Sequence, residues 1–433
     1  MATTTFAINF FILSIISLLS VPCLISASPP HSPYLLLIKK DPSTNLFYTT
    51  LAIGTPSKSF NLAIDLAGEN LWYDCDKNYN SSSYSPISCN SKSCPEDAIG
   101  CISCTSGPFK PGCTNNTCGA SAINQYAKFI FSAGFGEDII VISQMKVHGL
   151  ISACVEAEGF TSGFTSGSPL EGLPKSTRGI LGLSRSQLAL PNQLALENKI
   201  QPKFSLCLPS SNKLGYTNLM VKSIDGSVSK FVQTTPLIIN PDSTGVVSVK
   251  GVPSKEYFIA VKSVKIDGNV VNIMPSQLSI DRKGNGGTKI STMSPFTELQ
   301  SSVYKPFVRD FVKKALDRKM KRVASVAPFE ACFDSRTIKK SVTGFVVPTI
   351  DLVLQGGVQW RIHGANSMVM AKENVACLAF VDGGTEPKMS FVKASIVIGG
   401  YQLVDNLLVF DLDSSKLSFS SSLLLHNASC SHL

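Results

Sequence analysis

The sequence predicts an all-β protein built from two lobes with a cleft between them. Short runs of β-branched and aromatic residues dominate the chain, and Gly, Ser, Asn and Pro separate these runs. Such a pattern is typical of strands and turns. The chain has 433 residues, which exceeds the usual size of a single hydrophobic core. A weak internal repeat indicates that the two lobes are built alike.

The clearest strand candidates are runs of β-branched and aromatic residues bounded by turn-forming residues. They are Phe129–Phe131, Ile139–Ile142, Glu256–Ile266, Val346–Leu354 and Leu407–Asp411.

One segment, from about Ser301 to Lys319, has the periodicity of a helix. Six apolar residues share one face at helical spacing: Val303, Phe307, Val308, Phe311, Val312 and Ala315. Proline is tolerated only in the first turn of a helix. Because of Pro306, we expect the helix to begin a few residues after Ser301.

The internal repeat pairs a turn with a later apolar element that contains glycine. In the first half, a strand and turn centred on Asp65 precede Arg178–Leu183. In the second half, a strand and turn centred on Ser291 precede Ala394–Gly400. Each apolar element follows its turn by about a hundred residues. Two homologous lobes explain this arrangement.

The beginning of the chain reads as a secretory signal peptide. Phe10–Leu19 form a short apolar run, and small residues near Ala27 offer a cleavage point. The run is too short, and too close to Pro22, to favour a membrane-spanning helix. We therefore expect an exported, soluble protein that is not held in a membrane once residues 1–27 are removed.

The lobe boundary is predicted in a loop-rich stretch, Asn240–Pro253, which contains two prolines and two glycines. This gives an N-terminal lobe over residues 28–245, with a cysteine-rich insertion, and a C-terminal lobe over residues 246–433.

Cysteine usage supports export. Thirteen cysteines are encoded, and Cys23 lies in the signal peptide. An even number in a secreted chain predicts disulfides, here up to six. The other twelve are Cys75, Cys89, Cys94, Cys101, Cys104, Cys113, Cys118, Cys154, Cys207, Cys332, Cys377 and Cys430. Although the spacing of Cys101 and Cys104 also occurs in zinc sites, export favours disulfides, and we expect neither a metal nor a cofactor.

Charge and glycosylation motifs fit an extracellular protein. The formal net charge of +9 could attract nucleic acid, but export and the absence of RNA-binding motifs argue against that partner. Acidic proteins or anionic wall polymers suit a basic exported protein better. Asn80, Asn115 and Asn427 each begin an Asn-x-Ser/Thr motif and are candidate glycosylation sites.

Several of these segments together resemble the pepsin-like aspartic proteases, over nearly the whole mature chain. The matching segments are Ile53–Pro56, Asp65 with Asn70–Trp72, Gly179–Leu183, Ile398–Gly400 and Phe410–Asp411. The resemblance implies a two-lobed acid-protease fold with a central cleft and a few short helices. It also implies that Asp65 and Ser291 occupy the positions of the two catalytic aspartates.

The active-site motifs depart from that family. The proteases have Asp-Thr/Ser-Gly at both turns, and the threonine hydroxyls brace the turns against each other. Here Leu66 follows Asp65, and the second turn reads Ser291, Thr292, Met293. The tyrosine expected on the flap hairpin has no clear counterpart, and Tyr126 is only a distant candidate.

The missing second carboxylate removes the chemistry that the family uses. Two carboxylates that share a proton serve as acid and base. With Ser291 in the second position, we expect Asp65 to be an ordinary ionised acid, hydrogen-bonded to backbone donors and to Ser291. Both are then relic positions, and the protein is not an enzyme. A residual aspartic endopeptidase is the alternative.

A second resemblance is closer. Residues 65–68, 286–292, 322–329 and 398–408 are similar to the plant subgroup of xylanase and xyloglucan-endoglucanase inhibitors, extracellular dermal glycoprotein and basic seven-S globulin. It implies a glycoside hydrolase as partner, with a cation presented to the carboxylates of that enzyme. Arg322 matches one inhibitory arginine of the subgroup. The other has no counterpart, and His426 is the substitute candidate in that region.

Two alternatives remain for these residues. Arg322 follows a run of lysines and arginines, so it can simply belong to a solvated helix end. The protein can also be a non-enzymatic cell-wall or storage glycoprotein that binds a protein or peptide.

For the cysteines, we expect those from Cys89 to Cys118 to cross-link the insertion. We also expect Cys332 to pair with Cys377, and Cys207 to pair with Cys430.

Overall fold

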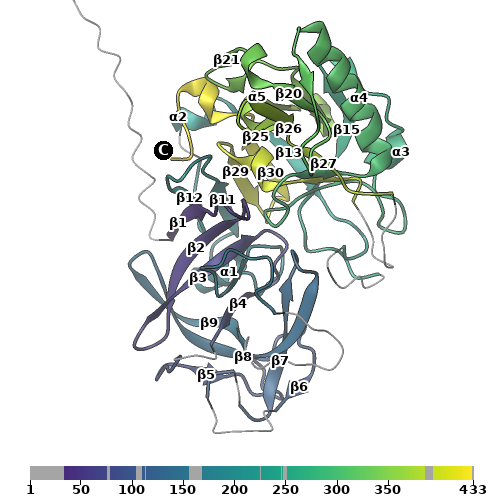
Figure 1. Cartoon of the computed structure of the whole chain (residues 1–433). Helices are drawn as coiled ribbons and strands as arrows, with labels where there is room; N and C mark the ends of the chain where they lie inside the picture. Colours follow the sequence, from purple (N-terminus) through teal and green to yellow (C-terminus); the bar gives the residue numbers. More distant parts are fainter. Residues whose placement is uncertain are drawn as a thin grey trace, which may run out of the picture.

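The computed structural model consists of two lobes, one from each half of the chain (Figure 1). It describes residues 34–75, 79–103, 110–112, 114–155, 168–224, 226–244, 246, 251–385 and 394–431. The predicted signal peptide therefore lies outside the described residues, and the lobe boundary at residue 245 stays a prediction. In Figure 1 the N-terminal lobe (purple to teal) lies below the C-terminal lobe (green to yellow).

Strands carry most of the architecture. The N-terminal half contributes β1 (Leu35–Lys40), β2 (Phe47–Ile53), β3 (Lys58–Asp65), β4 (Leu71–Asp74), β5 (Ser85–Pro86), β6 (Cys101–Ile102), β7 (Thr117–Asn124), β8 (Phe129–Ile142), β9 (Met145–Val155), β10 (Gly179–Gly182), β11 (Lys203–Cys207), β12 (Gly215–Asn218) and β13 (Val232–Ile238).

The C-terminal half adds strands to the shared network and three smaller sheets. The shared strands are β14 (Phe258–Ile259), β17 (Thr288–Ile290), β18 (Thr297–Leu299), β27 (Phe380–Asp382), β28 (Ile396–Ile398), β29 (Leu407–Asp411) and β30 (Lys416–Ser420). The smaller sheets are β15 (Val261–Ile266), β16 (Asn269–Val270), β23 (Ile350–Leu354) and β24 (Gln359–Ile362); β19 (Arg322–Val323), β20 (Cys332–Asp334), β25 (Met368–Lys372) and β26 (Val375–Leu378); and β21 (Lys340–Ser341) with β22 (Gly344–Phe345).

Helices are few and mostly short. They are α1 (Leu190–Glu197), α2 (Gly226–Ser229), α3 (Pro275–Leu278), α4 (Ser301–Asp317), α5 (Gly364–Ser367) and α6 (Gly400–Leu403), with 3₁₀ turns η1 (Ser335–Thr337), η2 (Gln355–Gly357) and η3 (Leu423–His426). Among the described residues, no helix is long and apolar enough to cross a membrane.

The internal repeat corresponds to the same strand arrangement in each lobe. In the N-terminal lobe, β10 runs parallel to β3 and places Gly182 opposite Asp65. In the C-terminal lobe, β28 runs parallel to β17 and places Ile398 opposite Ile290. Each turn with a key residue is therefore supported by the apolar element that follows it in sequence.

A six-stranded run of pairings, β1–β12–β11–β29–β30–β13, joins the two halves. Across its centre, Phe204 of β11 stacks on Phe410 of β29 with ring centroids 4.8 Å apart. The largest cluster of buried apolar side chains contains residues from both halves of the chain. The lobes thus share one continuous core beneath this sheet.

The helix expected near Ser301 forms, but its start was predicted wrongly. Helix α4 begins at Ser301 and encloses Pro306. The proline removes the N–H that would bond to the carbonyl of Ser302, and Ser302 is exposed to water. Burial of the apolar face, which includes Phe307 and Phe311, outweighs a proline cost of about 3 kcal/mol.

The expected strands are present with some changed limits. Residues 129–131 and 139–142 both belong to the long strand β8, and 407–411 match β29. The segment 346–354 is a strand only from Ile350, because Pro348 has no N–H for a ladder. In the segment 256–266, pairing begins at Phe258 and is interrupted at Ala260.

Five disulfides are described, and both specific pairs expected from the sequence are confirmed. These two are Cys207–Cys430 and Cys332–Cys377. The disulfides Cys89–Cys101 and Cys94–Cys118 cross-link the insertion, and Cys75 pairs with Cys154. Because Cys101 is in a disulfide, it is not available as a zinc ligand. Cys104 and Cys113 lie outside the described residues, so complete pairing stays a prediction that thiol counting tests.

The Cys207–Cys430 disulfide anchors the C-terminal tail to β11. The two cysteines are 223 positions apart in sequence. Loss of a native disulfide typically costs about 2–5 kcal/mol. We expect the double variant Cys207→Ser/Cys430→Ser to lose about this much in guanidinium unfolding and to speed amide exchange in residues 421–431. The matched variant Cys332→Ser/Cys377→Ser should leave exchange in that tail unchanged; equal acceleration in both variants would contradict a local anchor.

Candidate functional site

Asp65 ends strand β3 at the base of the first active-site-like turn. Its Oδ1 accepts the backbone N–H of Ala67 at 2.8 Å, and its main-chain oxygen accepts from Leu183 at 2.8 Å. The residue is fully buried. Among the described residues, Oδ2 has no hydrogen-bond partner.

Ser291 occupies the matching turn after β17. Its N–H donates to the carbonyl of Ile398 at 2.9 Å, and its Oγ accepts from the N–H of Met293 at 3.2 Å. The hydroxyl thus caps its own turn, and the expected hydrogen bond to Asp65 is not among the described interactions. The position that the resemblance assigns to the second catalytic carboxylate thus holds a group that cannot ionise as an acid near neutral pH.

Thr292 supplies half of the brace between the two turns. Its hydroxyl donates to the carbonyl of Ile64 at 2.6 Å and accepts from the N–H of Leu66 at 3.1 Å. A threonine at position 66 would form the equivalent two hydrogen bonds to the backbone of the second turn. Leu66 has no hydroxyl and cannot form them. The lobes are therefore linked here by a single side chain that satisfies two buried backbone groups.

The environment of Asp65 differs from that expected for an ordinary ionised acid. Burial of the carboxyl raises its pKa to about 7, and the negative charge of Glu256 acts in the same direction. The N–H groups of Ala67 and Gly68 and the charge of Lys289 oppose this shift. Desolvation disfavours the charged form of an acid, so Asp65 does not have the properties of an ordinary carboxylate.

A buried ion pair, not singled out from the sequence, lies near Asp65. Nζ of Lys289 is 2.8 Å from Oε1 of Glu256. Glu256 is 5% exposed, and its other oxygen accepts hydrogen bonds from Thr244 and Ser254. All polar atoms of this carboxylate are occupied. The sequence did contain one signal for a charge at this site. Lys289 stands two residues before Ser291, and alternate residues of a strand share a face.

Glu69, a charged residue next to the first turn, takes part in a contact between the lobes. Nζ of Lys255 lies 3.4 Å from a carboxylate oxygen of Glu69 and also pairs with Asp97 of the cysteine-rich insertion. The sequence offered no explanation for Glu69 because its partners are far away along the chain. The pair is half exposed, so we ascribe to it positioning more than stability.

The β7–β8 hairpin contains Tyr126, the distant candidate for the flap tyrosine, at its tip. The Asn124 side chain donates to the carbonyls of Pro169 and Glu171 at 2.9 Å each, and its Oδ1 accepts from the N–H of Tyr126. The Tyr126 ring covers Gly172 so closely that an added Cβ there would lie 2.2 Å from a ring carbon. The tip is therefore fastened to a neighbouring loop.

Arg322 lies on the short edge strand β19 and is exposed. Among the described residues, its guanidinium has neither an ion-pair nor a hydrogen-bond partner. Strand β19 pairs with β20, with Arg322 opposite Phe333 and Val323 opposite Cys332. A disulfide joins Cys332 of β20 to Cys377 of the next strand, β26. Arg322 thus extends from a cross-linked sheet, beyond the end of α4.

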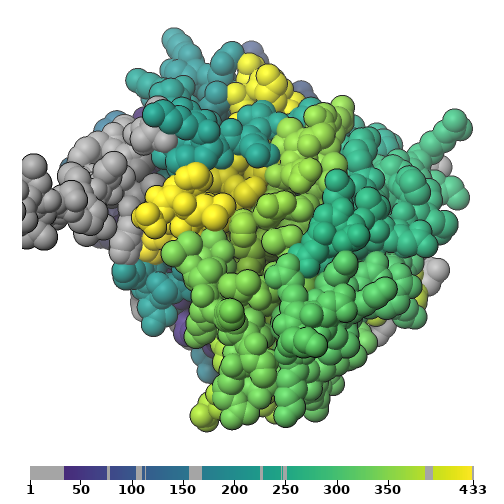
Figure 2. Space-filling view, turned by 90° about the horizontal axis from the view of Figure 1, so that it is seen from above, coloured from purple at the N-terminus to yellow at the C-terminus, as the bar shows by residue number. Residues whose placement is uncertain are grey.

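His426 lies in the anchored tail, apart from Arg322. Its ring stacks on Phe231 with centroids 3.8 Å apart, and it is exposed. Figure 2 shows the yellow tail on the surface beside teal residues of the first half. No hydrogen bond, ion pair or ring contact among the described residues joins His426 to Arg322, so the structure does not merge them into one cluster.

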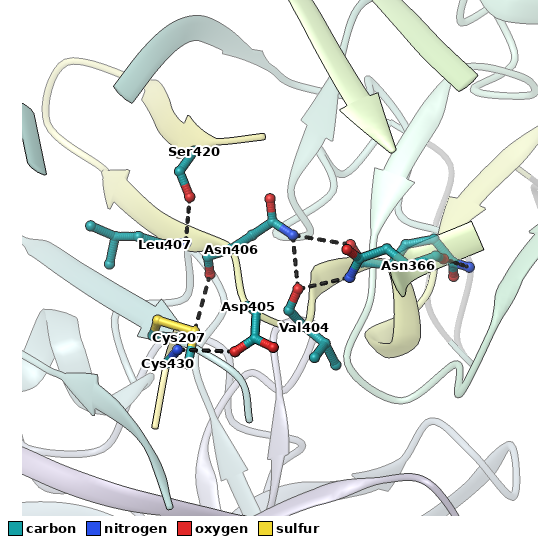
Figure 3. The surroundings of a disulfide bond; sticks show 9 residues. Cys207, Asn366, Val404, Asp405, Asn406, Leu407, Ser420 and Cys430 are labelled. Carbon is teal, nitrogen blue, oxygen red and sulfur yellow. Dashed lines mark hydrogen bonds between the residues drawn. A yellow bond between two sulfur atoms is a disulfide. The ribbon is translucent and has the colours of Figure 1, made fainter. Parts of the chain in front are cut away.

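Buried hydrogen bonds hold the C-terminal tail, residues 421–431, against the rest of the C-terminal lobe. Asp405 accepts the N–H of Cys430 at 3.0 Å, and Asn406 donates to the carbonyl of Val404 at 2.9 Å (Figure 3). Asp405 is 2% exposed. The disulfide and these bonds together hold the short 3₁₀ turn that ends at His426.

All three glycosylation motifs begin at exposed asparagines: Asn80, Asn115 and Asn427. Asn427 has a left-handed backbone with φ of 53° directly after His426. A glycan on Asn427 would share the surface with that ring. Exposure makes attachment possible at each site, and occupancy stays a prediction.

The raised pKa of Asp65 has a consequence for stability. In the folded state the carboxyl keeps its proton up to about pH 7, whereas an unfolded aspartate releases it near pH 4. The folded state therefore binds more protons in this window, and stability falls as pH rises from about 4 to about 7, by at most about 1.4 kcal/mol per pH unit. Asp65→Asn should remove this component.

The measurement is the urea midpoint of the parent and of Asp65→Asn between pH 4 and pH 8. Asp413→Asn, at an exposed loop position, is the matched control and should keep the slope of the parent. If Asp65→Asn also keeps that slope, Asp65 is ionised in the fold.

Comparison with known families agrees with this architecture in both lobes. Residues 47–219 match the family model described as "Xylanase inhibitor N-terminal", and residues 256–421 match "Xylanase inhibitor C-terminal". Together the two matches cover more than half of the chain.

Individual proteins are similar over almost their whole length. A protein of Nicotiana benthamiana named "Probable aspartic proteinase GIP2" is 44% identical over 414 residues, which is 92% of this chain and 91% of that protein. "Gamma conglutin 1" of Prunus dulcis is 36% identical over 99% of this chain and 96% of its own. The crystal structure of edgp superimposes with a TM-score of 0.83 at 40% identity, covering 94% of this chain and 99% of that one. The two-lobed, pepsin-like β-fold is thus confirmed, and the chain belongs to the xylanase-inhibitor family of aspartic-protease-like proteins.

Proposed function

We propose that this protein is a secreted, proteolytically inactive member of its family that inhibits a glycoside hydrolase, either an endoglucanase or a xylanase. The observation that carries the proposal is the combination of a pepsin-like scaffold with Ser291 at the second catalytic position. The relatives' family description, "Xylanase inhibitor", supplies the class of partner.

The geometry of the turns supports the loss of proteolysis. Acid proteolysis needs a water molecule between two carboxylates, one of which is ionised. Here Asp65 is the only acid of the pair, and Ser291 Oγ is engaged by the N–H of Met293. Leu66 and Met293, both buried, replace further residues of the protease motif.

The surroundings of Arg322 support the inhibitory role. A contact residue must be accessible, free of internal partners and held on a rigid element. Arg322 is exposed on β19, and the Cys332–Cys377 disulfide lies in the adjacent strands. A guanidinium presented in this way can form a bidentate pair with a carboxylate, and glycoside hydrolases carry two carboxylates in their clefts. His426 is the second candidate contact.

Export to the extracellular space, the apoplast and cell wall in a plant, is part of the proposal. Five described disulfides favour an oxidising compartment. The apolar run Phe10–Leu19 supplies a signal for secretion. The predicted partner is a microbial or cell-wall hydrolase; nucleic acid and membranes are not predicted partners.

A non-enzymatic wall or storage glycoprotein is the second candidate. It is favoured by the exposure of all three glycosylation motifs and by the name of the relative gamma conglutin. Titration of the purified protein into a panel of fungal xylanases and endoglucanases separates the two. Stoichiometric loss of activity of one of these enzymes supports inhibition, and no loss with any of them supports the glycoprotein role.

We expect no measurable hydrolysis of denatured haemoglobin at acid pH, because only Asp65 remains of the dyad. Ser291→Asp alone should stay inactive, since Leu66 still lacks the hydroxyl of the second brace. The assay compares the parent, Asp65→Asn and Ser291→Asp. Hydrolysis by the parent that Asp65→Asn abolishes would establish the residual endopeptidase instead.

Arg322→Ala should weaken inhibition by roughly 30-fold or more. Truncating one partner of a desolvated charge pair at an interface typically costs about 2–5 kcal/mol, and each 1.4 kcal/mol is tenfold in affinity. Folding stability should change by no more than about 0.5 kcal/mol, because the side chain is exposed. His426→Ala should have a smaller effect.

The control for Arg322 is Lys321→Ala, which removes a neighbouring exposed charge. Inhibition constants are measured against a hydrolase that the parent inhibits. If both variants lose the same amount, or Arg322→Ala loses nothing, the contact lies on another part of the surface.

A further inference from the structure

An open groove, lined by the residues after β13 and by residues of the C-terminal lobe, is not used by the proposed inhibitory function. Its volume is about 610 Å³, within the range of small-molecule sites, about 300–1,000 Å³. It lies between the end of β13, the start of β15 and helix α3. Neither Arg322 nor His426 lines it.

Most of the groove wall is apolar. Val261 and Leu278 belong to the buried core, at 2% and 4% exposure, and Ile280 packs against a second cluster that contains Phe258. Ile239 also lines the groove, yet it is 56% exposed. A large aliphatic side chain in this position is available to cover an apolar ligand.

Two cations complete the lining. Lys262 and Arg282 are both exposed, and neither side chain has an ion-pair or hydrogen-bond partner among the residues that the structure describes. Lys262 stands at a register irregularity of β15, where Val261 and Ser263 pair with consecutive residues of β23. Such bulges redirect side chains, and here the lysine contributes to the groove.

The single acidic residue among the lining residues is already engaged. Asp281 accepts the N–H groups of Lys283 and Asn285 at 2.7 and 2.9 Å, which closes the loop that carries Arg282. These bonds engage Oδ1, and the carboxylate keeps its negative charge, so the lining carries two positive charges against one negative charge. The two cations remain available for an external anion.

We propose that this groove binds a small amphipathic carboxylate, with an alkyl or aromatic body against Ile239, Val261 and Leu278 and its carboxylate between Lys262 and Arg282. The apolar wall selects a ligand with a hydrophobic body, and the two unpaired cations select its charge. A site of this kind is independent of hydrolase inhibition.

The experiment is isothermal titration of the full mature protein with decanoate at pH 7, below its micelle concentration. We expect saturable one-to-one binding. Acetate has the charge without the chain, and decyltrimethylammonium has the same chain with the opposite charge; both should bind far more weakly. Equal affinity for decyltrimethylammonium, or no saturable binding of decanoate, overturns the proposal.

Variants locate the site. Lys262→Ser/Arg282→Ser should weaken decanoate binding by about 2- to 30-fold, the range expected for loss of two exposed ion pairs. Ile239→Asp should weaken it as well, by placing a like charge in the groove. The matched control, Lys265→Ser/Lys283→Ser, removes two charges of neighbouring residues that do not line the groove and should bind as the parent does. Equal loss in both double variants would show a general charge effect and exclude the groove.

Discussion

The hydroxyl of Thr292 is the interaction on which the centre of this molecule depends. It bonds at once to the carbonyl of Ile64 and the N–H of Leu66, so one side chain of the second lobe satisfies two buried backbone groups of the first. An unsatisfied buried group costs about 1–3 kcal/mol. A protease would use a reciprocal pair of such threonines, and here the shared sheet supplies the rest of the link between the lobes.

Burial and nearby charges decide the electrostatics of the centre. Asp65 is buried, and its pKa is raised to about 7 chiefly by that burial. The full charges lie elsewhere, in the compact pair of Glu256 and Lys289 and in the contact of Lys255 with Glu69 and Asp97. Lys289 balances the charge of Glu256, whereas the single charge of Lys255 faces the two carboxylates of Glu69 and Asp97.

The two contact residues of the proposed function lie on the outside of the molecule, on elements that disulfides hold. The Cys332–Cys377 disulfide lies beside the strand of Arg322, and Cys207–Cys430 fixes the turn of His426. A rigid platform reduces the entropy lost when a side chain is immobilised at an interface. This arrangement is consistent with the proposed function, in which the protein binds a partner through its surface.

The sequence by itself determined the fold class and the two-lobed repeat, and it led us to expect the pairing of Cys207 with Cys430 and Ser291 at the second aspartate position. Each of these follows from periodicity, from motif spacing or from a resemblance carried by several segments together. The tertiary structure alone decided the pKa of Asp65, the partners of Glu69 and the groove beside Ile239. It also decided that Pro306 stands inside α4. These features depend on desolvation, on charges distant in sequence and on the burial of a whole helix face, and such quantities exist only once the chain has folded.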